Sequence, residues 1–275
     1  MTSPFFSIVL PTKNNAAYLE AALDSIISQS YCDWELIIIN DGSSDNTALL
    51  LQRYLSDTRV HLHTLVRSRG VPYALNLGIS YACGQWIVRH DGDDVSLPSR
   101  LGALHDFIKS RPDVVLLGSD IYLADQDGSI YSTQTYCYED QSIRIKWLRA
   151  SPFCHPSIAF RRESFLQAGG YNASLRVAED YELYFRLAQH GCIANIALPL
   201  YILRIHPQST SWTRLNKLLL HTLLIRLWVV AVYNISFTFT DVLLSTLQFL
   251  LLPLTHRQKM KLWTIYRQHF HNIID

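Results

Sequence analysis

The sequence predicts an α/β fold, in which a mainly parallel sheet with flanking helices is followed by an apolar helical appendage. Three observations predict it. Strand-like and helix-like patterns alternate through residues 5–122, a cluster of carboxylates follows a short apolar run at residues 91–94, and the composition changes at residue 212. Alternation at this pace indicates βαβ units, whose strands run parallel.

Each element of the first half is identified by its hydrophobic period. Leu19, Leu23 and Ile26 recur at the spacing of one helix face, whereas the short apolar runs have the length of strands. Asp45 is placed to cap the helix that follows it. The expected strands are 5–10, 34–39, 60–66, 86–90 and 114–122, and the expected helices are 16–30, 45–55, 72–82 and 98–109.

The pattern changes after residue 122. Asp127-Gly128 is a hairpin turn signal and leads into an aromatic-rich segment at 130–138. Helical spacing at 140–148, 163–168 and 179–190 and an apolar run at 157–160 complete this half. We therefore expect one domain over residues 1–211, with halves 1–122 and 123–211, and a separate segment over residues 212–275.

Composition and charge limit the possible functions. Of the 275 residues 49% are hydrophobic and 17% charged, which is typical of a globular protein with a large core. The net charge is +1, but residues 1–211 carry 17 basic and 21 acidic side chains (−4) and residues 212–275 carry 7 and 2 (+5). This asymmetry argues against a nucleic-acid-binding body and for a basic tail with its own role.

Cysteine usage and the N-terminus indicate the compartment. The five cysteines show no C-x-x-C spacing and their number is odd, so we expect neither a disulfide framework nor a zinc site. Residues 1–13 lack the basic and apolar regions of a secretory signal. A reducing cytoplasm fits best.

The stretch Asp91-Gly92-Asp93-Asp94 is the first candidate site. Three carboxylates within four residues repel one another, and their hard oxygen atoms suit Mg²⁺ or Mn²⁺ shared with a substrate phosphate. Carboxylates that follow a strand also lie where open α/β sheets bind ligands. The alternative is a solvated loop, and the similar Asp125-Gln126-Asp127 is interpreted as a turn because Gly128 follows it.

Four motifs together resemble the family-two inverting glycosyltransferases of the GT-A fold, over about residues 5–211. They are Pro11–Asn14 (PTKN), Asn40–Asp45 (NDGSSD), Asp91–Asp94 (DGDD) and Glu179–Asp180 (ED), in the family's order. The resemblance implies a Rossmann-like GT-A sheet, a nucleotide-diphosphate sugar donor, a divalent metal and direct displacement at the anomeric carbon.

The resemblance assigns residues to the donor and the metal. The donor-binding residues it implies are Pro11, Thr12, Asn14, Asp41, Arg67, Arg69, Gly70 and Asp91. Asp93 is implied as a direct metal ligand, Asp91 as a ligand of the ribose or of the metal and its water shell, and His206 as a further ligand. Two departures are Lys13, where the family often has an aromatic residue, and Arg69, where it usually has Asn.

Alternatives stay open at several of these positions. Asp41 could merely form a turn, Arg67 and Arg69 could face solvent, and His206 could be structural or lie on the acceptor side. Asn76 is expected to hold a loop by hydrogen bonds, and Asp94 to cap the next segment.

The resemblance also implies the acceptor side. An inverting transfer needs a base that takes the proton of the acceptor hydroxyl, and Asp180 is the expected base, with Glu179 in a positioning role. The alternative is that both carboxylates only stabilise a helix N-terminus. His155 and Arg162 are expected to shape the acceptor pocket.

The tail suits a membrane surface. Between Leu227 and Leu254 the only charge is Asp241, and each flanking uncharged run would span about 20 Å as a helix, against a hydrocarbon core of about 30 Å. Basic residues and three tryptophans flank these runs. We expect in-plane or re-entrant helices, with a true spanning helix, a soluble helical subdomain or a homodimer interface as alternatives.

The sequence thus predicts an inverting, metal-dependent glycosyltransferase of surface polysaccharide, lipopolysaccharide or glycolipid synthesis. Its expected partners are a nucleotide-diphosphate sugar and a lipid-linked or saccharide acceptor, and its expected location is cytoplasmic, attached to the inner face of the cell membrane. Two rivals remain: a sugar-nucleotide-forming nucleotidyltransferase, and a non-catalytic, membrane-attached binding protein. No glycine-rich triphosphate loop stands at Pro11–Ala16, which argues against the first rival.

Overall fold

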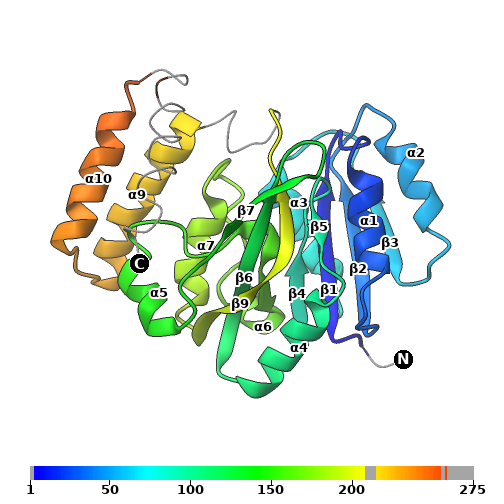
Figure 1. The fold of residues 1–275 in the computed structure, drawn as a ribbon, viewed down its shortest axis with the longest axis horizontal. Helices are drawn as coiled ribbons and strands as arrows, with labels where there is room; N and C mark the ends of the chain where they lie inside the picture. The colour runs from blue at the N-terminus through cyan, green and yellow to red at the C-terminus, as the bar shows by residue number, and fades with distance from the viewer. Residues whose placement is uncertain (1–2, 208–214, 255–257, 259–275) are drawn as a thin grey trace. The chain divides into compact units, whose positions relative to one another are not determined.

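A computed structural model of the chain describes residues 3–207, 215–254 and 258 (Figure 1). The chain divides into two compact units, Met1–His206 and Pro207–Asp275, which are described separately. The boundary expected after Ser211 falls among residues 208–214, outside the described residues.

The first unit is built on one nine-stranded sheet, whose order is β3-β2-β1-β4-β8-β6-β9-β5, with β7 paired to β6. The strands are β1 (Phe6–Thr12), β2 (Trp34–Asn40), β3 (Val60–Thr64), β4 (Trp86–Arg89), β5 (Val95–Ser96), β6 (Val114–Ala124), β7 (Ile130–Gln134), β8 (Ala159–Arg161) and β9 (Cys192–Arg204). The five strands expected in the first half are therefore present.

The sheet is mixed rather than mainly parallel. From β3 to β4 every pairing is parallel, as the βαβ pattern predicts. β8 pairs antiparallel with both β4 and β6, and β7 and β5 are also antiparallel to their neighbours. β8 begins beside the end of β4 and runs back toward its beginning, because Ala159 pairs with Val88 and Arg161 pairs with Trp86. The expectation of parallel strands therefore holds from β3 to β4 and again for the pair β6 and β9.

The longest strand, β9, was not expected from the sequence. It runs parallel to β6 over 13 residues. Asn195 and Pro199 interrupt its apolar alternation, and the pairing register shifts near Asp120, opposite Pro199. Irregular register lets a strand accept such residues, and it also hides the strand from a search for period two.

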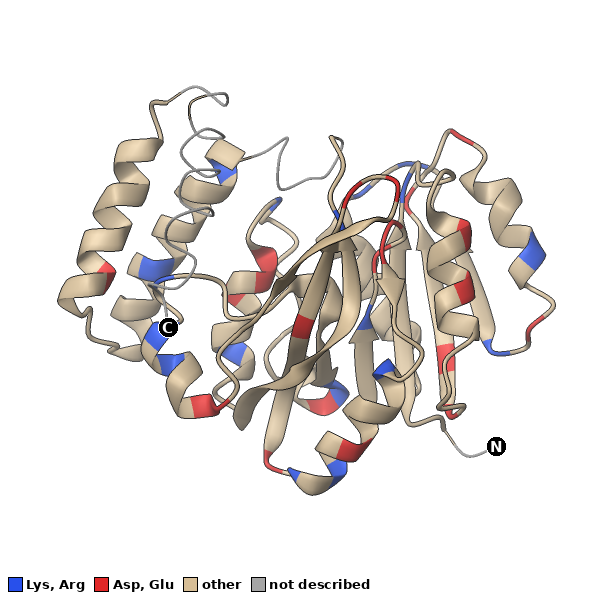
Figure 2. Ribbon diagram, viewed as in Figure 1, with Lys and Arg blue, Asp and Glu red and all other residues tan. Residues whose placement is uncertain are grey.

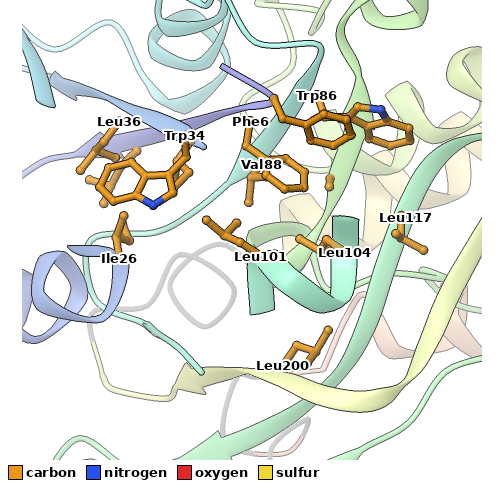
Figure 3. Close-up of a cluster of buried hydrophobic side chains, with 14 of the residues drawn as sticks. Phe6, Ile26, Trp34, Leu36, Trp86, Val88, Leu101, Leu104, Leu117 and Leu200 are labelled. Carbon is orange, nitrogen blue, oxygen red and sulfur yellow. The ribbon is translucent and has the colours of Figure 1, made fainter. Parts of the chain in front are cut away.

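Helices cover both faces of the sheet. They are α1 (Leu19–Ile27), α2 (Thr47–Leu51) with a 3₁₀ turn at Gln52–Tyr54, α3 (Val71–Tyr81), α4 (Arg100–Ser110), α5 (Asp140–Lys146), a 3₁₀ turn at His155–Ser157, α6 (Arg162–Gln167) and α7 (Glu179–Leu187). Strand alternation decides which helix meets which face. Val88 packs with Leu101 and Leu104 of α4 in the cluster of Figure 3. Val9 faces α3, because a Cβ on Gly78 would approach its side chain to 2.5 Å.

The second unit contains two apolar helices, α9 (Leu215–Tyr233) and α10 (Phe239–Leu251). The Thr238 hydroxyl accepts a hydrogen bond from the Asp241 N–H (3.2 Å), and the Asp241 carboxylate accepts one from the Thr238 N–H (2.8 Å). This capping box begins α10. Asp241 therefore stands at the start of a second helix and not in the middle of one long helix.

Contacts between α9 and α10 show that they run antiparallel. Gln248 Nε2 donates to the Leu219 carbonyl at 3.0 Å, and Arg226 Nη1 donates to Gln248 Oε1 at 2.9 Å and to Ser245 Oγ at 3.3 Å. Later residues of α10 thus meet earlier residues of α9, which defines a helical hairpin.

Candidate active site

Parallel pairing brings three of the predicted motifs to one edge of the sheet. Thr12 pairs with Asn40 at the ends of β1 and β2, and Val9 pairs with Arg89 at the end of β4. The residues that follow these strands therefore emerge together, as Figure 2 indicates by the acidic positions in the neighbouring loops. This edge is where open α/β sheets bind ligands.

The acidic motif gathers three carboxylates. Oxygen atoms of Asp91, Asp93 and Asp94 lie within 4.8 Å of one another. Burial raises the pKa of Asp91 to about 6; the charge of Arg89 opposes this rise and that of Asp93 adds to it. Burial, followed by the charges of Asp93 and Asp91, raises the pKa of Asp94 well above its ordinary value. The three carboxylates carry more negative charge than Arg89 alone neutralises, so hard oxygen ligands here fit a divalent cation.

Asp94 contacts the end of β9. Its Oδ1 accepts the Arg204 N–H at 2.8 Å, and its Oδ2 is buried without a hydrogen-bond partner in the described parts of the chain. The motif is thereby tied to the last residue of β9. No local pattern in the sequence indicates this contact, because β9 itself was not predicted.

His206 lies beside the acidic motif. Its Nε2 lies 2.9 Å from Asp93 Oδ2, its side chain is buried, and its ring lies 5.1 Å from that of Tyr18. An imidazole nitrogen at this place could serve a metal as ligand or hold the Asp93 carboxylate.

On the donor side, Thr12 presents an unpaired group. Its Oγ1 is buried with no hydrogen-bond partner among the residues described, and a Cβ on Gly92 would come within 2.9 Å of it. Pro11 is buried in β1 opposite Ile39. Asn14 has a positive φ of 53°, and its Oδ1 accepts the Ser44 N–H at 2.8 Å. Asn14 therefore joins two loops of the site.

Asp41 holds the loop at residues 67–70. Its buried carboxylate accepts hydrogen bonds from Ser68 Oγ (2.6 Å), the Arg69 N–H (2.7 Å) and the Gly70 N–H (2.9 Å). The side chains of Arg67 and Arg69 are exposed, and the Arg69 guanidinium lies 4.4 Å from the Tyr73 ring centre. Both of the alternatives considered for Arg67 and Arg69, phosphate contact and solvent, remain compatible with this placement.

The expected base stands at the first turn of α7. Ala178, which precedes it, has a left-handed φ of 59°, a strained conformation for a residue other than glycine. Burial and then the charge of Asp180 raise the pKa of Glu179 to about 7. Burial is also the main cause that raises the pKa of Asp180, whose Oδ2 accepts the Tyr184 hydroxyl at 3.3 Å. A carboxylate of raised pKa is a better proton acceptor.

Asn76 connects the acceptor half to the first half through Tyr171, which also contacts His155. His155 Nε2 lies 2.9 Å from the Tyr171 hydroxyl, and burial holds the pKa of His155 well below its ordinary value, so the imidazole is neutral. Asn76 accepts the Tyr171 N–H at 2.9 Å and donates to the Tyr171 carbonyl at 2.8 Å. The expectation that Asn76 holds a loop is confirmed.

Arg162 does not belong to this group. Its N–H donates to the Gln85 carbonyl at 3.0 Å, at the beginning of β4, whereas the acidic motif follows the end of β4. Because β8 is antiparallel to β4, the chain leaves the site as it passes from His155 to Arg162. The expectation that Arg162 shapes the acceptor pocket is therefore wrong.

Two residues of the site were missed. Arg89 is 4% exposed and its Nη1 lies 2.5 Å from Asp91 Oδ2. The Tyr201 hydroxyl accepts the Asp91 N–H at 3.1 Å. An arginine at the end of an otherwise apolar strand was a usable signal for the first. The second is supplied by β9, so no local pattern indicates it.

Comparison with known proteins agrees with this geometry. Residues 7–169 match the sequence profile of the family described as Glycosyl transferase family 2. The O-antigen biosynthesis glycosyltransferase WbnJ from Escherichia coli is 30% identical over 210 residues, which are 74% of this chain and 81% of WbnJ.

Two solved structures share the fold. TarS from S. aureus in complex with UDP-GlcNAc matches with a TM-score of 0.64 and 17% identity, over 80% of this chain and 66% of that one, so this chain spans just under two thirds of it. The mannosyltransferase PcManGT from Pyrobaculum calidifontis in complex with GDP-Man and Mn2+ matches with a TM-score of 0.60 and 18% identity, over 95% and 84%. These likenesses show a common GT-A fold. Because the family profile covers more than half of the sequence, the chain belongs to Glycosyl transferase family 2.

Proposed function

We propose that the chain is an inverting glycosyltransferase that moves a sugar from a nucleotide-diphosphate donor to an acceptor hydroxyl, with Mg²⁺ or Mn²⁺ bound. One observation carries this proposal. In a chain that belongs to Glycosyl transferase family 2, oxygen atoms of Asp91, Asp93 and Asp94 lie within 4.8 Å of one another directly after β4. This carboxylate cluster supports a metal that binds a donor diphosphate, and the carboxylates of Glu179 and Asp180 at the start of α7 support a base for the acceptor hydroxyl.

The donor would occupy the edge formed by β1, β2 and β4. Asp93 and Asp91 would hold the metal, with His206 beside Asp93, and Thr12 and the loop at 67–70 would line the nucleotide. A divalent ion there would offset the negative charge of the departing diphosphate. UDP-GlcNAc and GDP-Man in the two neighbouring structures support a nucleotide-sugar donor without selecting the base.

Asp180 would act as the base. It takes the proton of the acceptor hydroxyl while that oxygen attacks the anomeric carbon and the bond from this carbon to the diphosphate oxygen breaks. The attack comes from the face opposite the leaving group, so one displacement inverts the configuration and no covalent enzyme intermediate forms. Glu179 positions the first turn of α7, and Tyr184 holds the Asp180 carboxylate.

We propose the class of acceptor from the similarity to WbnJ and from the apolar character of the C-terminal segment. WbnJ is named as an enzyme of O-antigen biosynthesis, which supports a saccharide or lipid-linked acceptor in surface polysaccharide, lipopolysaccharide or glycolipid synthesis. An apolar tail would keep such an enzyme beside its acceptor.

A donor screen tests the function. Purified protein with Mn²⁺ is offered nucleotide-diphosphate sugars, release of nucleoside diphosphate is measured, and proton NMR of the product reports the anomeric configuration. Inverted product with loss of turnover in EDTA is expected. Pyrophosphate release from a nucleoside triphosphate and a sugar phosphate would identify a nucleotidyltransferase instead, and donor binding without any turnover a binding protein.

A second experiment separates the base from donor binding. Asp180→Asn keeps the shape of the side chain but accepts no proton, so kcat should fall by roughly 10²–10⁴. The Kd for nucleoside diphosphate with Mn²⁺ should change little. Asp127→Asn makes the same chemical change in an exposed turn outside the site. It is the matched control and should leave kcat unaltered.

We also propose that the α9–α10 hairpin attaches the protein to the inner face of the cell membrane. α9 is long and apolar enough to cross a bilayer, with 19 residues and a mean hydropathy of 1.6, whereas α10 has 13 residues and is too short. In Figure 2 both helices carry few charged positions. A hairpin with one long and one short helix, and with buried Arg226 between them, suits an in-plane or re-entrant position better than a span.

The exposed residues of the hairpin support this proposal. They form a stripe of large apolar side chains, called here the apolar stripe: Leu220, Leu224, Leu227, Trp228, Val232, Phe239, Val242, Leu243, Leu247, Phe249 and Leu250. Apolar burial should outweigh charge attraction, which salt screens. We expect detergent, and not high salt, to release the full-length protein from membranes. Protein that fractionates as a soluble dimer would instead make the stripe a dimer interface.

A further inference from the structure

The loop at residues 170–178 leads from α6 into α7, whose first residues are Glu179 and Asp180. Its backbone is left-handed at both ends, with φ of 76° at Gly170 and 59° at Ala178. An alanine in this conformation is strained, and such strain persists only where the surrounding structure holds the chain. The contacts of this loop therefore help to fix where α7 begins.

The first part of the loop is held by Asn76 of α3. Asn76 Oδ1 accepts the Tyr171 N–H at 2.9 Å, and Asn76 Nδ2 donates to the Tyr171 carbonyl at 2.8 Å. A Cβ on Gly170 would approach Asn76 Oδ1 to 3.0 Å, so the loop backbone lies close to α3. The Tyr171 side chain is buried, and its hydroxyl lies 2.9 Å from His155 Nε2. This end of the loop is thus fixed to both halves of the first unit.

The second part of the loop is held by Arg176, which stands three residues before Glu179. Arg176 Nη1 donates to the Arg69 carbonyl at 3.1 Å, although 107 residues separate the two in the sequence. A Cβ on Gly70 would lie 2.9 Å from the same nitrogen, so the guanidinium lies against the backbone of the loop at 67–70. The loop before α7 therefore contacts the loop that would line the nucleotide.

The acceptor of this hydrogen bond belongs to a peptide that Asp41 also holds. The Asp41 carboxylate accepts the Arg69 N–H at 2.7 Å and the Gly70 N–H at 2.9 Å. The Arg69 carbonyl and the Gly70 N–H are the two ends of one trans peptide, and in a planar trans peptide these groups point in opposite directions. Asp41 and Arg176 thus hold one rigid peptide from opposite sides. Any rotation of this peptide acts directly on Arg176.

We propose that Arg176 is a positioning residue for the transfer: its hydrogen bond to the Arg69 carbonyl fixes the 170–178 loop, and with it the first turn of α7, to the donor-binding loop at 67–70. Binding of the donor would then order the segment that carries the base. This inference rests on the proposed function, because it takes the 67–70 loop as part of the donor site and Asp180 as the base.

Two substitutions test the hydrogen bond. Arg176→Lys keeps N–H donors at the end of a long side chain, whereas Arg176→Met keeps a long side chain without a donor. At saturating acceptor and Mn²⁺, kcat of Arg176→Met should fall about 10–100-fold, since a misplacement of about 1 Å costs on this order, and the donor KM should change by a smaller factor. Arg176→Lys should recover most of kcat. Unchanged kcat in Arg176→Met, or equal losses in both variants, would overturn the role of this hydrogen bond.

Hydrogen exchange measured by mass spectrometry gives a readout that does not depend on turnover. Amides of the 170–178 loop, such as the Leu175 N–H that donates to the Asn172 carbonyl at 3.1 Å, exchange when the loop opens. The probes are UDP and GDP, each with Mn²⁺. The nucleotide that binds should slow exchange at 67–70 and at 170–178 in the unchanged protein. In Arg176→Met it should slow exchange at 67–70 alone.

Three results of this measurement have separate meanings. Loop protection at 170–178 that persists in Arg176→Met contradicts the proposal, and so does its absence in the unchanged protein while 67–70 is protected. If neither nucleotide protects 67–70 in the unchanged protein, the proposed donor site is wrong instead. Full kcat in Asp180→Asn would likewise overturn the proposed base and not the contact of Arg176.

Arg161→Met is the matched control. Arg161 Nη2 also donates to a backbone carbonyl, that of Pro112 at 2.7 Å, but Arg161 pairs with Trp86 at the beginning of β4, away from the acidic motif. The substitution removes the same kind of hydrogen bond and should leave kcat and the exchange of the 170–178 loop unchanged. A loss of kcat as large as that of Arg176→Met would mean that general destabilisation, and not the position of the base, explains both.

Discussion

His206 Nε2 lies 2.9 Å from Asp93 Oδ2, although 113 residues separate the two in the sequence. The contact of Arg204 N–H with Asp94 Oδ1 at 2.8 Å brings the end of β9 to the same place. The acidic motif therefore has two contacts with one late segment, from Arg204 at the end of β9 and from His206 just beyond it. The affinity for the proposed metal would then depend on residues far outside the motif.

The first prediction concerns that dependence. Asp93→Ala should abolish measurable Mn²⁺ binding, and His206→Gln should weaken it by about 10–100-fold, the usual loss when a ligand or the group that orients one is removed. Isothermal titration with Mn²⁺ measures both.

The control is His105→Gln. His105 Nδ1 also lies beside a carboxylate, 3.2 Å from Asp106, but on α4 and outside the site. It should bind Mn²⁺ like the unchanged protein. Equal affinity in His206→Gln would mean that His206 neither binds the metal nor holds Asp93.

The second prediction concerns stability against pH. The folded-state pKa of Glu179 is raised from 4.5 to about 7, mainly by burial and then by Asp180. The folded form therefore binds this proton more tightly than the unfolded chain does, and stability falls as pH rises from about 4.5 to about 7. Glu179→Gln resembles the protonated side chain and does not titrate. We compare the free energy of unfolding of Glu179→Gln with that of the unchanged protein at each pH. The difference should change in favour of the variant by on the order of 1–3 kcal/mol from pH 5 to pH 8.

Urea unfolding at the two pH values measures this difference. Glu163→Gln, in the first turn of α6, makes the same chemical change at an exposed position and is the control. A difference between Glu179→Gln and the unchanged protein that is constant from pH 5 to pH 8 would show that burial does not perturb Glu179.

The third prediction concerns the close approach of two loops. Gly42 has a φ of +66°, and a Cβ there would lie 2.7 Å from Ser68 N and 2.9 Å from the Arg67 carbonyl carbon. Gly42→Ala should cost about 1–3 kcal/mol of stability, since both the backbone conformation and the contact are unfavourable. It should also raise the donor KM more than it lowers kcat, because the loop held by Asp41 is displaced.

Gly102→Ala is the contrasting change. Gly102 lies in α4, and a Cβ there would meet nothing nearer than Ser30 Oγ at 4.0 Å. It should stabilise the protein by about 0.5–1 kcal/mol through helix propensity and leave the donor KM unchanged. Thermal unfolding and donor titrations of the two variants test the pair together.

The sequence was sufficient for much of the first half of the fold. Helix period and strand length located β1, β2, β3 and β4 and the helices between them, because these strands are short segments rich in apolar residues that are separated by helical patterns. It was insufficient for β9, in which Asn195 and Pro199 break the alternation. The stability of β9 comes from its long-range pairing with β6, which no local pattern encodes.

The site residues also differ in how well the sequence predicts their positions. The motif residues Asp91, Asp93 and Asp41 follow strands directly, so their position at the sheet edge could be predicted. Arg162 was assigned to the acceptor side together with His155 because one segment that holds both resembles the family, whereas the antiparallel course of β8 carries Arg162 to the other end of β4. Sequence proximity says nothing about strand direction, and strand direction was the deciding quantity.

The last prediction concerns the apolar stripe. Leu224 and Leu227 of α9 are 52% and 61% exposed, so changing both to Asp should alter the stability of the fold little. Burying each leucine at a membrane boundary contributes roughly 1.5 kcal/mol or more, and two together correspond to a loss on the order of 100-fold in partitioning. Cosedimentation of the full-length protein with anionic vesicles measures this loss.

Leu49→Asp is the matched control, because Leu49 is 73% exposed but lies on α2 of the first unit. It should sediment as the unchanged protein does. If the double variant also keeps its membrane binding, the stripe does not face lipid; a shift of that variant from dimer to monomer on size exclusion would then identify the stripe as a contact between two copies of the chain.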